Sequence, residues 1–288
     1  MQRTDKHRWQ VSDQLAPIII VVTVLVAAVL FWPYGKKSQE TVKEETPAVV
    51  QDDLKLQGET AEPQIRYPVP QETEIPGSAI TQPQQEIQPL PALDKKKDSI
   101  EGEFRQLYDE QKFGGLFLQK NLIPNFVVTL DNMTDAKLPQ KYRFTQPLVG
   151  QFQAGKDAAG NEFIDTGNYG RYIPYIELAE AVDIRRFVSF YVRYYALFQQ
   201  AYHDLGYLDR YFNDRFVQVL DHLLAAPEIR VPIQLVRPRV YYQFADPELE
   251  ALSAGQKILV RIGPDNAARV KARIRELRQA LTSLSTKK

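Results

Sequence analysis

The stretch "DIRRFVSFYVRYYALFQQAYHDLG", residues 183–206, decides the fold because it reads as one long amphipathic helix. Asp183 is a favourable N-cap residue, and Gly206 is a typical C-terminal stop. At 100° per residue, a face of about 140° collects Phe187, Phe190, Tyr191, Tyr194, Tyr195, Phe198 and Tyr202, with Leu205 on the same side. We predict that this face packs in a core. The alternative is an exposed platform for stacking bases or sugars.

The residues around this helix predict a mainly α domain over 98–288 with a small β portion. A second amphipathic helix over 213–226, with Asn213 as N-cap, would form a helical hairpin with the first. Further helices are expected to begin at Asp98 and Asp246 and to cover 116–133 and 265–284. A weak hairpin turning at 159–161 and a strand pair or bent strand over 231–244 supply the β portion.

The composition excludes several classes of function. The chain has 288 residues, a formal net charge of zero and no Cys. It lacks the basic excess typical of nucleic-acid binders, so no nucleic-acid partner is expected. Disulfides, thiolate metal sites and a Cys nucleophile are also excluded.

The N-terminal region predicts a membrane anchor. Residues 14–35 carry no charge, and the apolar run over 15–32 would form a helix of about 27 Å, close to the thickness of a bilayer core. We assign residues 1–14 to a short cytoplasmic tail and 15–34 to a single transmembrane helix. Three basic residues flank the span on each side, so charge does not fix the orientation. The layout of tail, span, spacer and domain favours a bacterial inner-membrane protein with a periplasmic C-terminal domain.

Residues 35–97 are rich in Pro, Glu and Gln and predict a disordered linker. Such a segment buries too little apolar surface to offset the entropy lost on ordering. The simplest interpretation is a spacer that lets the domain work away from the membrane. An alternative is that a segment such as "RYPVPQ", residues 66–71, is a ligand for an aromatic-lined groove.

Candidate catalytic residues lie on and before the helix over 213–226. Asp209, Asp214, Asp221 and His222 could supply carboxylates and an imidazole for acid–base chemistry if they lined a cleft. The structural alternative is that the aspartates are solvated or paired with Arg210 and Arg215. No HExxH, GxSxG or P-loop pattern occurs, so no metal and no cofactor are expected, and a non-enzymatic role is favoured.

A set of basic residues near the C-terminus offers a candidate binding surface. Arg269, Arg273 and Arg275 flank the apolar stripe of the last helix, and Lys257 and Arg261 precede it. Together they could form a basic strip for an acidic partner or an anionic polymer. The alternative is a docked helix whose long basic side chains lie along its edges.

Five blocks of sequence together resemble one family. They are "FVVTLDNM" (126–133), "GRYIPYIELAEAVD" (170–183), "YALFQQAYHDLGY" (195–207), "YFNDRFVQVLDHLLAAPE" (211–228) and "YYQFADPELEALSAGQKILVRIGPDNAARVKARIRELR" (241–278). These blocks resemble the proteobacterial domain-of-unknown-function family 3014, whose layout also has an anchor and a Pro-rich tether. The resemblance implies an uncharacterised envelope protein and assigns no catalytic residue.

Two hypotheses of function follow. The favoured one is a membrane-tethered, non-catalytic envelope module that binds or scaffolds a protein or cell-wall partner. The competing one is a periplasmic hydrolase that acts on cell-wall material through Asp209, Asp214 or Asp221 with His222.

Overall fold

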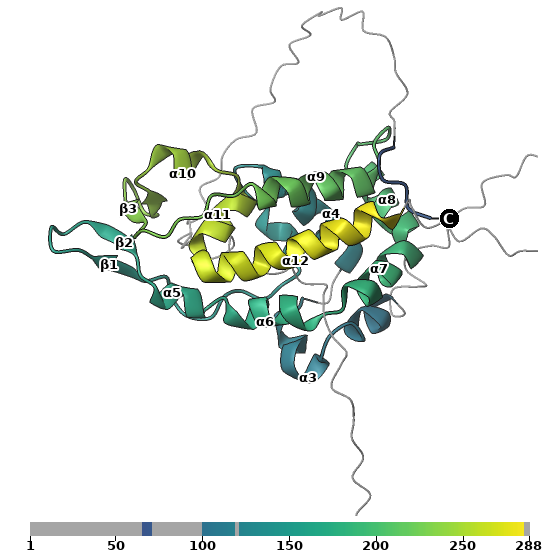
Figure 1. The fold of residues 1–288 in the computed structure, drawn as a ribbon, viewed down its shortest axis with the longest axis horizontal. Coiled ribbons are helices and arrows are strands. Elements are labelled where there is room, and N and C mark those ends of the chain that lie inside the picture. Colours follow the sequence, from purple (N-terminus) through teal and green to yellow (C-terminus); the bar gives the residue numbers. More distant parts are fainter. Residues whose placement is uncertain (1–64, 71–99, 119–120, 285–288) are drawn as a thin grey trace, which may run out of the picture.

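The computed structural model describes residues 65–70, 100–118 and 121–284, and this part of the chain is mainly helical (Figure 1). Residues 100–105 form the first described helical turns. The α-helices are α3 Glu110–Phe113, α4 Leu122–Asp131, α5 Gly167–Gly170, α6 Ile173–Ala181, α7 Ile184–Arg193, α8 Tyr195–His203, α9 Phe212–Leu224, α10 Pro247–Ala251, α11 Ala254–Arg261 and α12 Pro264–Thr282. The 3-10 helices are η1 Gly114–Leu116, η2 Asn132–Thr134 and η3 Gln140–Tyr142. The strands are β1 Ala154–Lys156, β2 Glu162–Ile164, β3 Gln234–Val236 and β4 Gln243–Phe244. The predicted mainly α fold with a small β portion is confirmed for these residues.

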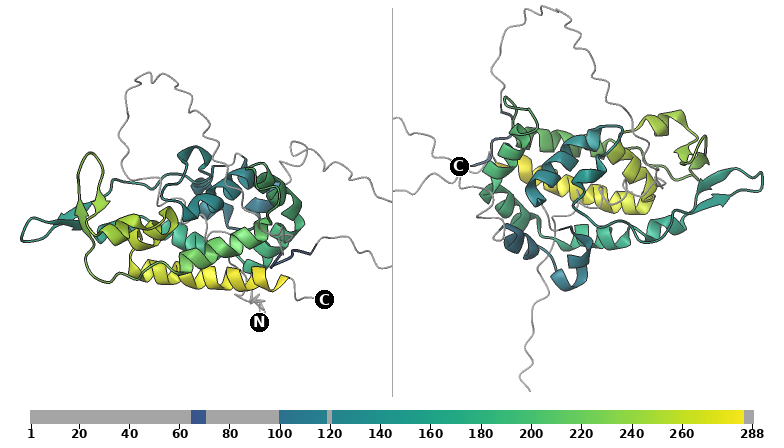
Figure 2. Two further views of the ribbon diagram at one scale, coloured as in Figure 1. Left: turned by 90° about the horizontal axis from the view of Figure 1, so that it is seen from above. Right: turned by 180° about the vertical axis from the view of Figure 1, so that it is seen from behind.

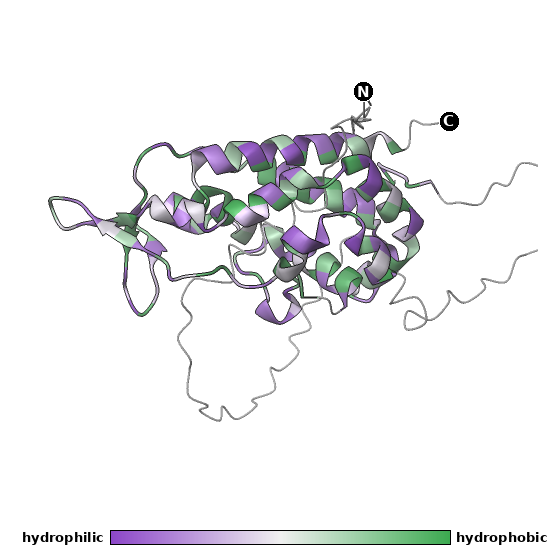
Figure 3. Cartoon of the chain, turned by 90° about the horizontal axis from the view of Figure 1, so that it is seen from below, coloured by the Kyte–Doolittle hydropathy of each residue, from purple (hydrophilic) through white to green (hydrophobic). Residues whose placement is uncertain are grey.

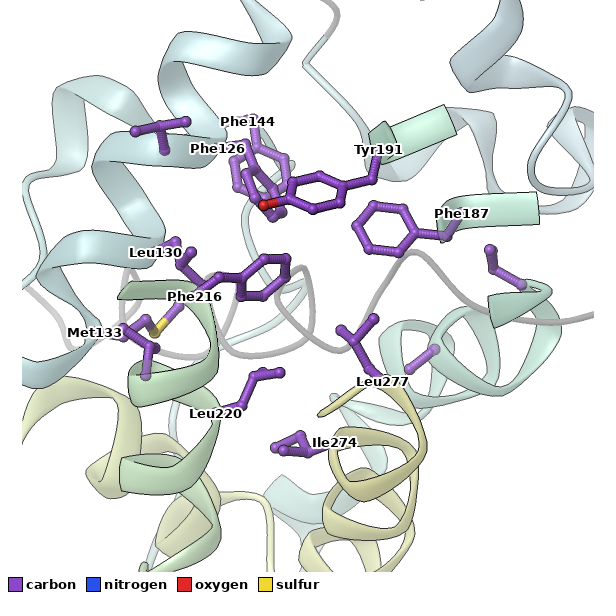
Figure 4. Packing of buried hydrophobic residues seen from close by; sticks show 14 of the residues in the cluster. Phe126, Leu130, Met133, Phe144, Phe187, Tyr191, Phe216, Leu220, Ile274 and Leu277 are labelled. Atoms are coloured by element: carbon purple, nitrogen blue, oxygen red, sulfur yellow. The ribbon is translucent and has the colours of Figure 1, made fainter. Parts of the chain in front are cut away.

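The core lies between α12 and the helices packed against it. The helix α12 runs beside α9 and also contacts α6, α7 and α11, while α4 packs against α8 and α9 (Figures 1 and 2). The apolar residues of α12 recur every three or four positions and are all buried: Val270, Ile274, Leu277 and Leu281. Polar and apolar residues therefore alternate along this helix (Figure 3). Ile274 and Leu277 face Leu220 and Phe216 of α9 across the core (Figure 4).

The stretch over 183–206 forms two helices, α7 and α8, that meet at Tyr194. The Asp183 cap is confirmed, since its side chain accepts the N–H of Arg185 at 2.7 Å and of Arg186 at 3.3 Å. The prediction of one continuous helix was wrong, because Tyr194 has φ −103° and ψ 12°, outside helical values. The aromatic face is confirmed as core: Phe187, Phe190, Tyr191, Tyr194, Tyr195, Phe198 and Tyr202 are all buried. The placement of Leu205 on this face was wrong, because α8 ends at His203 and Leu205 is exposed.

A small antiparallel sheet with strand order β1-β2-β3-β4 extends from one end of the helical body (Figures 1 and 2). The predicted hairpin is confirmed: β1 pairs with β2, and Asp157 accepts the N–H of Ala159 at 2.9 Å and of Asn161 at 2.8 Å in the turn. Gly160 adopts the φ of +86° that the turn requires. Residues 231–244 supply β3 and β4, which pair with each other on either side of Pro238.

The predicted tail over 1–14 and transmembrane helix over 15–34 lie outside the described residues, as does Asp98. Within the part of the chain that the structure describes, no helix is both long and apolar enough to cross a bilayer. Of the predicted linker over 35–97, the structure describes only residues 65–70. These residues lie against α8 and α9 rather than apart from the domain (Figure 1).

Candidate functional site

The start of α9 holds a segment of the Pro-rich region, residues 65–70, in what we call the α9 groove. Both oxygens of the Asp214 carboxylate accept main-chain N–H groups of this segment. The N–H of Arg66 donates to Oδ2 at 2.9 Å, and the N–H of Tyr67 donates to Oδ1 at 2.8 Å. Hydrogen bonds to a charged acceptor are stronger than neutral ones. Asp214 therefore fixes two successive residues of the segment through its main chain.

Two more side chains complete the contacts to the segment. Asn213 Nδ2 donates to the main-chain oxygen of Tyr67 at 2.8 Å, and the Tyr211 hydroxyl accepts the N–H of Val69 at 2.8 Å. Pro68, which lies between these contacts, has no N–H to satisfy. The N–H groups of Arg66, Tyr67 and Val69 are thus all bonded to Asp214 or Tyr211, at or near the start of α9.

Asn213 was predicted to be the N-cap of α9, and that prediction was wrong. The helix begins one residue earlier, at Phe212, and Tyr211 is the N-cap. Asn213 is fully buried, and its Oδ1 accepts the hydroxyl of Tyr191 at 3.1 Å. The side-chain amide of Asn213 therefore makes tertiary contacts instead of capping the helix.

A layer of buried polar groups from α7 and α8 supports Asn213 from behind. The hydroxyl of Tyr195 accepts the main-chain N–H of Asn213 at 3.3 Å and donates to Gln199 Oε1 at 2.9 Å. Gln199 Oε1 also accepts the N–H of Phe212 at 2.8 Å. Burial raises the pKa of Tyr191 and of Tyr195 well above that of free tyrosine, so both hydroxyls stay protonated and can donate. These hydrogen bonds fix the residues that form the groove, independently of the hydrogen bonds that the segment makes.

Beside the segment the groove opens into a cavity of about 650 Å³. Its lining includes Arg66 and Tyr67 of the segment, and side chains from α8, α9 and the connection between them, among them His203, Leu208, Asp209, Arg210 and Gln218. Leu208 is 76% exposed. Arg215, also in the lining, pairs with Asp131, whose carboxylate oxygen lies 2.7 Å from its Nε.

The structure brings three of the four candidate catalytic residues to this cavity. Asp209, Asp214 and Asp221 all line it, but His222 does not. His222 lies on another face of α9, where its Nε2 is 2.8 Å from Ser253 Oγ, and burial lowers its pKa. Asp214 bonds the segment, and Asp221 pairs with Arg278 of α12. Asp209 is exposed.

Among the described residues, no group of three His, Cys, Asp or Glu side chains is placed to hold a metal ion. The aspartates at the cavity are therefore placed near one another without forming a cluster that could act as a metal ligand set.

The basic residues proposed as a binding strip are mostly engaged within the domain. Arg269 pairs with Glu180 through two bonds of 2.7 and 2.6 Å, and Arg273 pairs with Glu276. Lys257 is buried and pairs with Glu250 at 2.6 Å, and Arg261 lies over the ring of Phe244. Arg275 is exposed. These contacts join α12 to α6 and α11 to α10 and β4, so most of the set serves packing between elements.

The residues that sequence reasoning missed are Tyr211 and Asn213, because their contacts are made by residues about 140 positions earlier in the chain. The signal that could have found the segment was present. The Pro-containing run "RYPVPQ" was considered as a ligand for an aromatic-lined groove, and the structure places residues 66–70 of it beside Tyr211 of its own chain.

A search of curated proteins and a search of solved structures find no match. A family profile described as "Protein of unknown function (DUF3014)" matches residues 122–278, which cover α4 to most of α12 and include the start of α9. The segment over 65–70 lies outside the matched range. Because the match covers more than half of the chain, this protein belongs to the domain-of-unknown-function family 3014.

Proposed function

We propose that the protein is a membrane-tethered envelope protein whose helical domain is a non-catalytic binding module for a protein partner. One observation carries this proposal: the α9 groove holds a peptide segment through its main chain, with Asp214, Asn213 and Tyr211 as the binding side chains. Hydrogen bonds to the main chain of a bound segment are a common basis of peptide recognition.

The tether belongs to the same proposal. An apolar run over 15–34 would anchor the chain in the bacterial inner membrane, and residues 35–97 would link that anchor to a periplasmic domain. A domain on a long linker can reach partners at a distance from the membrane. The proposed binding function includes no cofactor and no nucleic-acid partner.

The competing hydrolase on cell-wall material is less well supported by the contacts of its candidate residues. A general base must reach the proton that it removes, and a carboxylate whose oxygens are bonded within the chain is not free to do so. Asp214 and Asp221 are engaged in this way, and His222 faces Ser253 on another surface.

Site-directed crosslinking in the native host tests the binding function. A photo-crosslinking amino acid replaces Leu208, an exposed residue of the cavity, in the full-length protein. The matched control carries it at Val149, which is also a highly exposed aliphatic residue but does not line the cavity. We expect one protein species to be enriched from position 208 and not from position 149.

The same patterns from both positions, or no enriched protein from position 208, would reject the α9 groove as a partner site. Purified full-length protein incubated with isolated cell wall gives the second arm of the test. Release of soluble fragments by the wild type, lost on Asp209→Asn, would favour the hydrolase instead.

A further inference from the structure

We propose that the α9 groove recognises Pro-containing peptides of the pattern Tyr-Pro-Val, and that residues 65–70 of this chain are a built-in occupant that competes with the partner. This inference names the ligand class of the binding function proposed above and rests on it. Residues 65–70, seated in the groove, show the geometry that a ligand adopts there.

The first element of recognition is the main chain. The N–H groups of Arg66, Tyr67 and Val69 donate to Asp214, Asp214 and the Tyr211 hydroxyl at 2.9, 2.8 and 2.8 Å. Proline at position 68 restricts φ and lowers the entropy lost on binding. The groove therefore favours a proline directly after the residue that Asp214 and Asn213 hold.

The second element is the side chain at alternate positions. Val69 is only 5% exposed and belongs to the main hydrophobic core, and Tyr67 is half-buried and packs against the same core. Ile65 is 54% exposed, and Arg66, Pro68 and Pro70 are exposed. The groove thus reads the residues at positions 67 and 69 and tolerates variation at 66 and 70.

The third element is competition. A segment linked to the domain through residues 71–99 meets the groove at an effective concentration on the order of millimolar. A short segment with few buried side chains binds weakly by itself and exchanges readily. A partner peptide of the same pattern must therefore displace the segment, and its apparent affinity equals its intrinsic affinity multiplied by the fraction of time that the groove is vacant.

Peptide binding to the full-length chain tests this inference. The probe is a fluorescent synthetic peptide with the sequence of residues 63–72, followed by anisotropy. In one variant, residues 65–70 are replaced by a Gly-Ser stretch of the same length, and in a second, Val69→Asp alone disrupts the occupant. We expect both variants to bind the peptide at least tenfold more tightly than the wild type does, because their groove is vacated.

Matched controls separate recognition from general stickiness. In the Gly-Ser chain, Asp214→Ala should weaken peptide binding at least tenfold, since it removes the acceptor of two hydrogen bonds. Asp209→Ala, which lines the same cavity without a bond to the segment, should leave binding within twofold. A peptide with Asp in place of Val at position 69 should not bind. Unchanged far-UV circular dichroism confirms that each variant is folded.

Two outcomes overturn the inference: no peptide binding to either vacated variant, or binding that Asp214→Ala leaves unchanged. Failure here differs from failure of the proposed function. If position 208 crosslinks a partner but the peptide does not bind, the binding function stands and the peptide class is rejected. If the peptide binds but position 208 crosslinks no partner, the groove serves its own tether and the partner-binding function is rejected.

Discussion

The pair formed by Tyr191 and Asn213 gives a stability prediction that tests how the groove is built. Tyr191 is fully buried, and its hydroxyl donates to Asn213 Oδ1 at 3.1 Å. The other end of the same amide donates to Tyr67 at 2.8 Å. Asn213→Leu keeps the size of the side chain and removes both contacts. It leaves the Tyr191 hydroxyl with no hydrogen-bond partner in the core.

The expected cost follows from these contacts. A buried polar group left without a partner costs about 1–3 kcal/mol, and a lost hydrogen bond about 1 kcal/mol. Asn213→Leu should therefore reduce the free energy of unfolding by about 2–4 kcal/mol. When Asn213→Leu is combined with Tyr191→Phe, no hydroxyl is left without a hydrogen-bond partner. We expect the double variant to be less destabilised than the sum of the two single variants by about 1–2 kcal/mol.

Urea unfolding followed by far-UV circular dichroism measures these free energies, since the described residues are mainly helical and both Trp residues lie outside the domain. The four chains, wild type, two single variants and the double variant, form one thermodynamic cycle. Additive losses, with no coupling between the two positions, would refute the reasoning. They would mean that the hydrogen bond contributes nothing beyond the separate packing of the two side chains.

Three further changes can be measured on the same protein. Asp214→Ala should speed hydrogen exchange of the Val69 amide about tenfold or more, because the segment docks as one unit. The N–H of Val69 itself bonds Tyr211, so unchanged exchange at Val69 would show that the contacts of the segment form independently. Gly263→Ala should lower the free energy of unfolding by roughly 1–3 kcal/mol, because the residue has a φ of +87° and the added Cβ would lie 2.6 Å from the ring of Tyr169. An unchanged urea midpoint would show that alanine is accommodated there without strain. Burial lowers the pKa of His222, so just below pH 6.5 the unfolded chain binds more protons than the folded chain, and the free energy of unfolding falls as the pH drops through that window. His222→Gln should flatten this part of the stability profile, and an unchanged slope would mean that another group titrates there.

Local patterns predicted the elements that depend on neighbouring residues. The Asp183 cap, the buried aromatic face and the hairpin turn at 159–161 were each predicted from a few positions and are confirmed. The Asp246 cap is also confirmed, since its side chain accepts the N–H of Glu248 at 2.8 Å. Such features need only the local main chain and the period of the apolar residues, which the sequence displays directly.

Predictions failed where contacts between distant residues competed with local preference. Asn213 has a residue type that favours N-caps, yet the buried hydroxyl of Tyr191 and the main chain of Tyr67 engage its amide instead. The helix over 183–206 was predicted to be continuous, but it divides at Tyr194, whose hydroxyl donates to Glu103 at 2.8 Å. Periodicity cannot reveal either contact, because each partner lies far away in the sequence.

The sequence by itself determined the fold class, the core-facing residues of the main helices and the family to which the chain belongs. Only the tertiary structure decided what Asp214 does. Its partners Arg66 and Tyr67 are 148 and 147 positions earlier, in a segment whose composition is that of a spacer. Composition measures how much apolar surface a segment can bury alone, whereas the order of residues 65–70 comes from acceptors on another part of the chain that satisfy main-chain N–H groups.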